Sequence, residues 1–135
     1  MTTPPTTPNP LHTLTYPSAL LPNIPALAWP KRKDPGSSQW YWVDFTQWLQ
    51  TVGTIANEIN SVTGTLSGGD GMLTVGGAAV PYSSGTLTNN MVAIQLDAGT
   101  AGETYTVGFG VVTSEDTGSV LALEVRLVVD TLLTL

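Results

Sequence analysis

The sequence predicts an all-β fold: an immunoglobulin-like β-sandwich of about seven strands with an extended Pro-rich N-terminal arm. After residue 38, apolar and polar residues alternate in most stretches, which is the period of a strand with one buried face. Clusters of Gly, Asp and Ser separate these stretches at intervals of roughly 8–15 residues. Nine of the ten prolines lie in the first 35 residues. We therefore divide the chain into an arm, residues 1–38, and a sandwich domain, residues 39–135.

The arm begins with a stretch that cannot form a helix or a central strand. Residues 2–10 are all Thr, Pro or Asn, and because proline fixes φ and lacks an N–H donor, we expect them to be extended or disordered. Apolar side chains lie between the later prolines, where a simple linker would be polar. We favour packing of the arm against another subunit, with packing along its own domain as the alternative. The residues expected to bind a partner are Leu11, Leu14, Tyr16, Leu20, Leu21, Ile24, Leu27, Trp29, Lys31, Arg32 and Lys33.

Charge is distributed unevenly along the chain, whose net charge is −6. The basic triplet at residues 31–33 is either a solvated hinge or an electrostatic contact with the acidic surface of a neighbouring subunit. From Gly36 onward, Arg126 is the one basic residue, against nine acidic residues. Such a surface repels phosphate groups, so we expect no nucleic-acid binding. No run of about 18 apolar residues and no basic, apolar leader is present, so we expect no membrane span and no secretory signal.

The first strand of the sandwich domain is expected at residues 39–45. Alternation places Tyr41 and Val43 on one face of this strand and Trp40 and Trp42 on the other. Further strands are expected at residues 54–62, 73–75, 78–80, 91–96, 104–111 and 121–129, and a short turn at residues 46–49.

The core is expected to contain one dominant aromatic residue, either Trp42 or Trp48. The two last strands carry the clearest pattern, because bulky apolar residues alternate there with Thr, Gly, Glu124 or Arg126. Gly76 and Gly77 are expected to interrupt the strand that contains them.

The residues that carry chemistry are too few for a catalytic or metal site. The absence of cysteine excludes disulfides, thiol catalysis and cysteine-bound metals. His12, the single histidine, lies among prolines, so no rigidly held base is available to a serine nucleophile. Glu115 and Asp116 lie in an expected turn, where we expect both to be solvated. The turn at residues 68–71 offers one carboxylate, whereas calcium needs about 6–8 oxygens. We therefore expect no cofactor, no metal and no enzymatic activity.

Several short stretches resemble, in order and spacing, a family of small tailed-phage virion proteins. The most specific is Gly-Thr-Ala-Gly-x-Thr-Tyr-Thr-Val, from Gly99 to Val107. The other stretches are Lys33-Asp34-Pro35, residues 41–49, residues 54–56, residues 73–76, residues 111–116 and residues 123–129. Over residues 33–130 the chain thus resembles the immunoglobulin-like phage proteins described as fibre-to-tail adaptors.

This resemblance implies a bacteriophage virion structural protein, assembled in the host cytoplasm and located in the virion. It implies a neck or tail adaptor that links fibres or neighbouring ring proteins through its arm and sheet edges. The implied partners are tail, neck or fibre subunits, and the implied state is a homo-oligomer or ring. Two alternatives stay open: a capsid decoration protein on the head surface, and a carbohydrate-binding module of a host-recognition device, with Trp40, Tyr41 and Trp42 as aromatic platforms.

Overall fold

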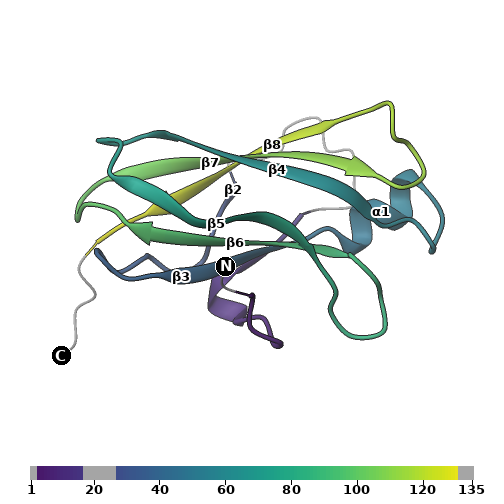
Figure 1. Cartoon of the computed structure of the whole chain (residues 1–135), viewed down its shortest axis with the longest axis horizontal. Helices are drawn as coiled ribbons and strands as arrows, with labels where there is room; N and C mark the ends of the chain where they lie inside the picture. Colours follow the sequence, from purple (N-terminus) through teal and green to yellow (C-terminus); the bar gives the residue numbers. More distant parts are fainter. Residues whose placement is uncertain (1–2, 17–26, 131–135) are drawn as a thin grey trace.

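The structure, a computed structural model, describes residues 3–16 and 27–130. Within these ranges two four-stranded sheets pack face to face (Figure 1). The first sheet has the order β1 (Thr13–Thr15), β3 (Gln39–Asp44), β6 (Met91–Ala98), β5 (Leu73–Tyr82). The second sheet has the order β2 (Leu27–Ala28), β8 (Leu121–Val128), β7 (Thr104–Thr113), β4 (Ile59–Gly68). The predicted all-β sandwich is confirmed at this level of detail.

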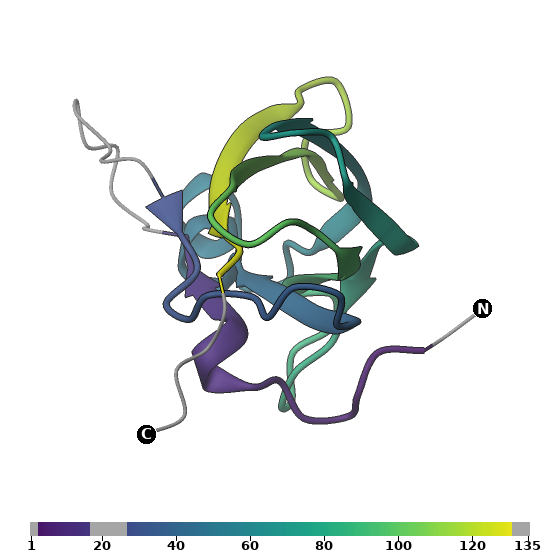
Figure 2. The same ribbon diagram turned by 90° about the vertical axis from the view of Figure 1, so that its left-hand side faces the viewer.

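The long strands are joined in antiparallel pairs, whereas the two short strands at the N-terminal side pair in parallel. β3 pairs with β6, β6 with β5, β4 with β7 and β7 with β8, all antiparallel. β1 lies parallel to β3, and β2 lies parallel to β8. The N-terminal part of the chain therefore contributes one edge strand to each sheet, as the view along the sandwich in Figure 2 shows.

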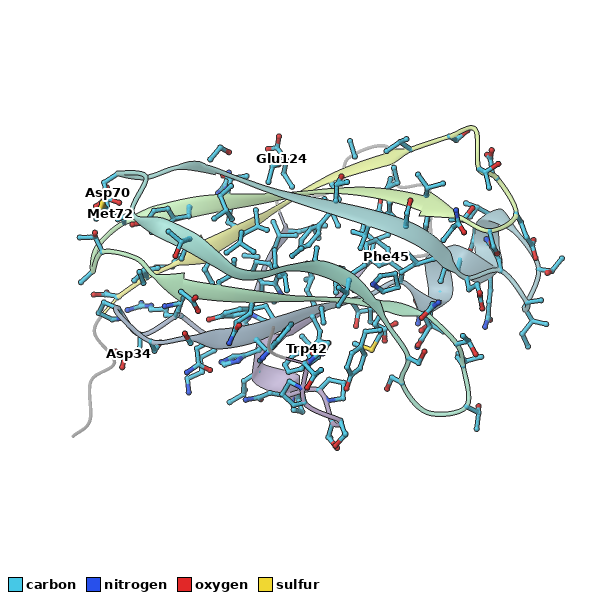
Figure 3. The ribbon with its side chains drawn as sticks, viewed as in Figure 1. Asp34, Trp42, Phe45, Asp70, Met72 and Glu124 are labelled. Carbon is cyan, nitrogen blue, oxygen red and sulfur yellow. The ribbon has the colours of Figure 1, made fainter. Side chains whose placement is uncertain are left out.

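The core lies between the two sheets and follows the predicted alternation. Tyr41 and Val43 of β3 point into it, as expected, and Phe45 lies between the sheets in Figure 3. The remaining fully buried core side chains of the long strands and of the helix α1 (Thr46–Val52) are Leu49, Ile59, Val92, Ile94, Leu96, Tyr105, Val107, Val111, Val125 and Leu127. Each position on these strands alternates with a residue on the outer face, which is the pattern of a sheet with one face in the core.

The predicted central aromatic was wrong. Trp42 is only 2% exposed, but it lies on the outer face of the first sheet, because alternation places it opposite Tyr41. Trp48 is half-buried at the edge of the core. The tryptophan inside the core is Trp29, whose ring centroid lies 5.0 Å from that of Tyr41 and whose indole N–H donates to the Trp42 carbonyl at 2.9 Å.

A helix and a turn replace two of the predicted elements between β3 and β4. The helix α1 (Thr46–Val52) stands where a short turn was expected, and the Asp44 carboxylate accepts from the Thr46 N–H at 2.9 Å. Residues 54–58 form a turn rather than a strand, closed by the Asn57 N–H bond to the Thr54 carbonyl. Ile55 gave the misleading alternation and is 76% exposed.

β5 runs through the glycine pair that was expected to interrupt it. Its pairing with β6 shifts register between Val75 and Gly77 and again between Gly77 and Val80, so the strand bulges rather than ends. A Cβ at Gly76 would clash with the carboxylate of Asp97. Glycine here leaves room for the side chains of Asp97 and Gln95 on the neighbouring strand.

Candidate functional site

Most described apolar residues of the predicted partner-binding set lie against the chain's own core. Tyr16 and Trp29 are buried, and Leu14 and Leu27 pack against the core cluster. For these four side chains the favoured interpretation, contact with another subunit, is corrected: strand pairing satisfies their backbone and the sandwich fills the space around them. The set has one further apolar residue in the described ranges, Leu11, which is exposed, while Leu20, Leu21 and Ile24 lie outside the described residues.

Lys33 is not a surface charge but a buried one, only 1% exposed. Its ammonium group donates to the carbonyls of Asp34 at 3.1 Å, Ser37 at 2.5 Å and Ala98 at 2.6 Å. Burial lowers the pKa of Lys33, while the charges of Asp97 and Asp34 oppose that shift. Its backbone N–H also donates to the Val128 carbonyl at 2.8 Å. Lys33 therefore fastens the segment before β3 to the second sheet and to the loop after β6.

The other two basic residues of the triplet are exposed. Arg32 forms an ion pair with Asp130 at 3.1 Å, and both side chains are largely in solvent. An exposed pair of this kind contributes little stability. Lys31 is exposed as well, so Lys31 and Arg32 are the members of the triplet that stay accessible to a partner.

His12 is held in a short 3₁₀ turn, η1 (Pro10–His12), capped by Asn9. Its ring stacks on Tyr41 at 4.7 Å, and Nδ1 lies 3.1 Å from the Trp40 carbonyl. Burial lowers the pKa of His12, the Trp40 carbonyl opposes this, and the charge of Lys31 lowers the pKa further. The histidine is thus a packed, rigid residue rather than a solvated one, and no serine hydroxyl is hydrogen-bonded to it among the described contacts.

Tyr105, at the beginning of β7, ties two loops together at one end of the sandwich. Its hydroxyl accepts from the Thr100 N–H at 2.9 Å and donates to the Asp70 carboxylate at 2.5 Å. Hydrogen bonds with Thr100 and Tyr105 lower the pKa of Asp70. The only carboxylate of the Gly-rich turn is therefore used by the fold, and residues 3–16 and 27–130 contain no group of three or more His, Asp or Glu side chains able to hold a metal.

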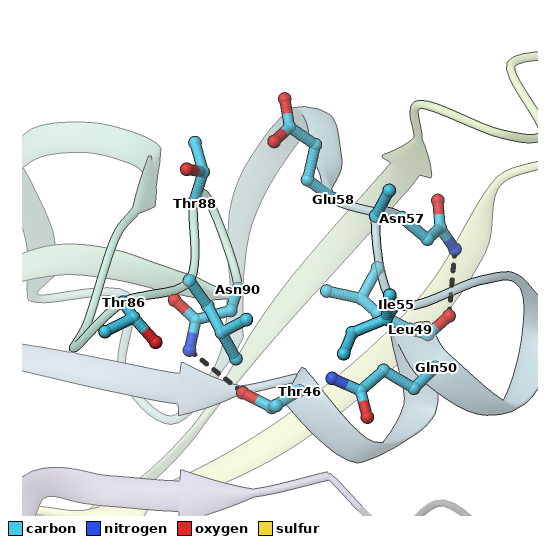
Figure 4. A pocket seen from close by; sticks show the side chains of 11 residues that line it. Thr46, Leu49, Gln50, Ile55, Asn57, Glu58, Thr86, Thr88 and Asn90 are labelled. Carbon is cyan, nitrogen blue, oxygen red and sulfur yellow. Dashed lines mark hydrogen bonds between the residues drawn. The ribbon is translucent and has the colours of Figure 1, made fainter.

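The opposite end of the sandwich carries α1, the turn at residues 54–58, and the loops at residues 83–90 and 114–120 (Figure 1). A pocket of about 290 Å³ opens between α1, this turn and the loop after β5 (Figure 4). Two buried amide side chains line this pocket. Asn57 donates to the Leu49 carbonyl at 3.0 Å, and Asn90 donates to the Thr46 hydroxyl at 2.9 Å. These amides hold the loops in place and are not available for chemistry.

The same pocket lacks a pair of groups for acid–base chemistry. Glu58 is its one ionisable side chain, and the rest of the lining is apolar, amide or hydroxyl. The neighbouring Glu115 was expected to be merely solvated, but its carboxylate accepts from the backbone N–H of Thr54 at 2.8 Å and from the Thr54 hydroxyl. These bonds lower the pKa of Glu115. Its role is to join the loop after β7 to the turn after α1.

Apolar side chains gather at this loop end. Val120 is 65% exposed, and Val52 is also exposed; together with half-buried Trp48 they border a groove of about 230 Å³. Ile55 stands exposed beside the polar pocket. Val52 and Val120 border one apolar groove, and Ile55 borders a second pocket at the same end, so this end is a candidate contact surface. Sequence reasoning missed it because Ile55 was assigned to a strand and Val52 to no element.

No helix in the described part of the chain is long and apolar enough to cross a bilayer. Comparison with curated proteins and with solved structures finds no match to this chain. A family model described as "Podophage GP4 fiber-tail adaptor protein gp77" matches residues 33–127. The match begins at buried Lys33 and ends within β8, so it covers the long strands and α1 but leaves out β1 and β2. The chain belongs to the podophage GP4 fibre-tail adaptor family.

Proposed function

We propose that this chain is a non-enzymatic structural component of a podophage virion that joins the tail to its fibres or to neighbouring ring proteins. The observation that carries the proposal is the family match over residues 33–127, which hold the long strands of both sheets. An adaptor must present docking surfaces on a rigid body, and the loop end, with Val52, Ile55 and Val120 in solvent, offers one. Tail and fibre proteins are the partners that the family implies, and a homo-oligomer or ring is part of the proposal.

We also propose that the sandwich is of the immunoglobulin type. The order β3-β6-β5 in one sheet and β8-β7-β4 in the other corresponds to the strand orders B-E-D and G-F-C of that fold. Tyr105 supports this assignment, because immunoglobulin-like domains carry a tyrosine near the start of strand F whose hydroxyl bonds to backbone a few residues upstream. Here the bond is to the N–H of Thr100.

In this fold the loops after strands B, D and F meet at one end, and antibody domains bind their antigens with loops of that end. The corresponding loops here are residues 45–58, 83–90 and 114–120, which form the loop end. Glu58, Glu115 and Asp116 make it acidic, so the matching partner surface is apolar with basic residues around it.

We also propose a boundary other than residue 38 between the arm and the sandwich domain. β1 and β2 belong to the sheets, so we propose that the segment before η1, residues 3–9, is the part of the arm that remains available for assembly. Three contacts support the absence of catalysis in this proposal. The carboxylates of Asp70 and Glu115 are hydrogen-bonded within the fold, and the His12 ring is packed on Tyr41.

The two alternatives differ from the adaptor in testable ways. A carbohydrate-binding module would need Trp40 and Trp42 as open platforms, but Trp42 is buried and Trp40 half-buried on the covered outer face of the first sheet. A capsid decoration protein would be present in hundreds of copies, whereas an adaptor forms one small ring per particle. Quantitative mass spectrometry of purified particles separates these two.

The direct test combines a phage deletion with surface variants. Particles that lack the gene for this chain are expected to retain filled heads and to lose their fibres in electron micrographs. Complementation with the double variant Ile55→Asp, Val120→Asp is expected to fail, because charges in the apolar contact oppose docking. Met72→Asp is the matched control, since Met72 is 59% exposed at the opposite end. Normal fibres on particles without the chain would overturn the proposal.

A further inference from the structure

The first sheet is unusual in being apolar on its outer face as well. Trp42, Tyr82, Met91 and Ala93 form a buried cluster there, with Trp40 and Val80 packed against it. Sheets of a sandwich normally expose polar residues on this side. This cluster, called here the outer cluster, is covered by the N-terminal segment at residues 3–9 rather than by another sheet.

The covering segment contacts the outer cluster lightly. The Tyr82 hydroxyl donates to the Pro5 carbonyl at 2.6 Å. In the described structure this is the one hydrogen bond between residues 3–9 and the outer cluster. Open grooves of about 370 and 310 Å³ remain on its two sides, lined by the segment and by Tyr82 or Trp42 respectively. Most residues of the segment are exposed. The segment therefore lies along an aromatic groove without filling it.

The groove also holds a donor that the segment does not use. The indole N–H of Trp42 is buried and has no hydrogen-bond partner in the described structure. A buried donor without an acceptor is destabilising, because it has lost its hydrogen bonds to water. Trp42 and Tyr82 thus form a pair of aromatic donors, their rings edge to face at 6.0 Å, of which one is already bonded to a proline carbonyl.

Two aromatic donors on an apolar groove match the chemistry of a polyproline II segment. Such a segment has no internal hydrogen bonds, so its carbonyls are free to accept, and its proline rings pack on aromatic faces. Its fixed φ angles reduce the entropy lost on binding. Pro4-Pro5-Thr6-Thr7-Pro8 has this composition, with Pro5 and Pro8 at the Pro-x-x-Pro spacing.

We propose that the outer face of the first sheet is a polyproline-binding groove, and that during assembly it accepts residues 4–8 of a second copy in place of its own. The groove already fits this segment, so the exchange needs no new surface and preserves each contact. Because one hydrogen bond from Tyr82 holds the segment, its release costs little free energy. This goes beyond the proposed function, because it concerns how copies join one another rather than what the adaptor connects.

Engineered cysteines test the exchange in the full-length chain, which has no cysteine of its own. Thr6 and Ser83 both line the groove, so Thr6→Cys in one copy and Ser83→Cys in a differently tagged copy are mixed and oxidised. The expected result is a mixed disulfide dimer whose yield rises with protein concentration. Ser119→Cys, at the loop end, is the control and is expected to form no such dimer with Thr6→Cys.

The double variant Thr6→Cys, Ser83→Cys in one chain decides the outcome. Exchange predicts intrachain disulfides in dilute protein and interchain disulfides in concentrated protein. Intrachain disulfides at every concentration, with no mixed dimer from the single variants, would overturn the proposal. Because this uses purified protein, its failure is distinct from a failure to attach fibres.

A second measurement tests recognition by the groove itself. A fluorescently labelled peptide of residues 2–10 is expected to bind the full-length protein, measured as a rise in fluorescence anisotropy. The same peptide with Ser at each proline is the control, and equal rises in anisotropy with both peptides would contradict proline recognition.

Discussion

Two segments on the N-terminal side of β3 are attached to the sandwich in different ways. Residues 27–33 pair with β8, place Trp29 in the core and bury the Lys33 ammonium among three carbonyls. Residues 3–9 lie on an outer face and are held to it by one tyrosine hydroxyl. Both segments are rich in proline or adjacent to it, so composition alone does not separate them. The difference lies in which side chains they carry into the sandwich.

The comparison shows that a chain can use similar extended segments for two purposes. The segment at residues 27–33 is part of the fold, and its family match begins within it at Lys33. The segment at residues 3–9 lies outside that match. Lys33 thus lies inside the family match, whereas Trp29 of the inner segment and the whole outer segment, residues 3–9, lie outside it.

The largest expected effect comes from the core tryptophan. Trp29→Ala removes a ring that contacts Tyr41 and Phe109 and is expected to reduce the free energy of unfolding by about 3–5 kcal/mol. Denaturant unfolding followed by circular dichroism measures this. Trp40→Ala, at a half-buried position of the outer cluster, is the matched control and is expected to cost less. A loss below about 1 kcal/mol for Trp29→Ala would show that the segment is not part of the core.

The next effect comes from the buried ammonium. Lys33→Met keeps the volume of the stem but leaves three carbonyls without their donor, and we expect a loss of about 2–3 kcal/mol. Lys31→Met, which removes an exposed charge, should change stability by no more than about 0.5 kcal/mol. Equal effects of the two variants in thermal unfolding would contradict the fastening role of Lys33.

A smaller effect is expected where the outer segment is attached. Tyr82→Phe removes one hydroxyl bond to Pro5 and should cost about 0.5–1.5 kcal/mol. Tyr105→Phe is the comparison, because it also removes one hydroxyl, but this hydroxyl makes two hydrogen bonds that join loops. We expect Tyr105→Phe to reduce the free energy of unfolding by about 1–3 kcal/mol. If Tyr82→Phe cost more than Tyr105→Phe, the outer segment would be as much a part of the fold as the inner one.

The smallest effect is that of mild acid on η1, which follows the outer segment. Because burial holds the pKa of folded His12 below its usual value of 6.5, the unfolded chain binds a proton first as the pH falls. The stability contributed by neutral His12 is therefore complete above about pH 6.5 and decreases below it. Unfolding midpoints at about pH 7.5 and 5.5 measure this, and His12→Phe, which keeps a ring on Tyr41, should reduce the difference.

The long strands could be predicted from the sequence because their alternation is strict. Tyr105, Val107 and Val111 all face the core as expected, since one face of β7 is buried along its length. The turn at Asp70 was equally clear, because glycines there adopt positive φ that other residues avoid. Local pattern and tertiary structure agree in these places.

The roles of Trp29, Lys33 and the outer cluster could not be predicted in the same way. β2 is only two residues long and pairs with a strand almost a hundred positions later, so no local period marks it. A lysine is almost never fully buried unless its charge is compensated. The carbonyls that compensate Lys33 belong to Asp34, Ser37 and Ala98, and the last of these lies far away in the sequence. The sequence alone does not assign Trp42 to the surface or to the core, because it does not show that residues 3–9 cover this side chain.

The parallel pairing of β2 with β8 also has a consequence for biosynthesis. Trp29 and Lys33 are translated long before their backbone partners Arg126 and Val128. Until then the second sheet lacks its closing strand, and the early tryptophan has no finished core to enter. Residues 27–33 therefore reach their final places only after β8 has been synthesised.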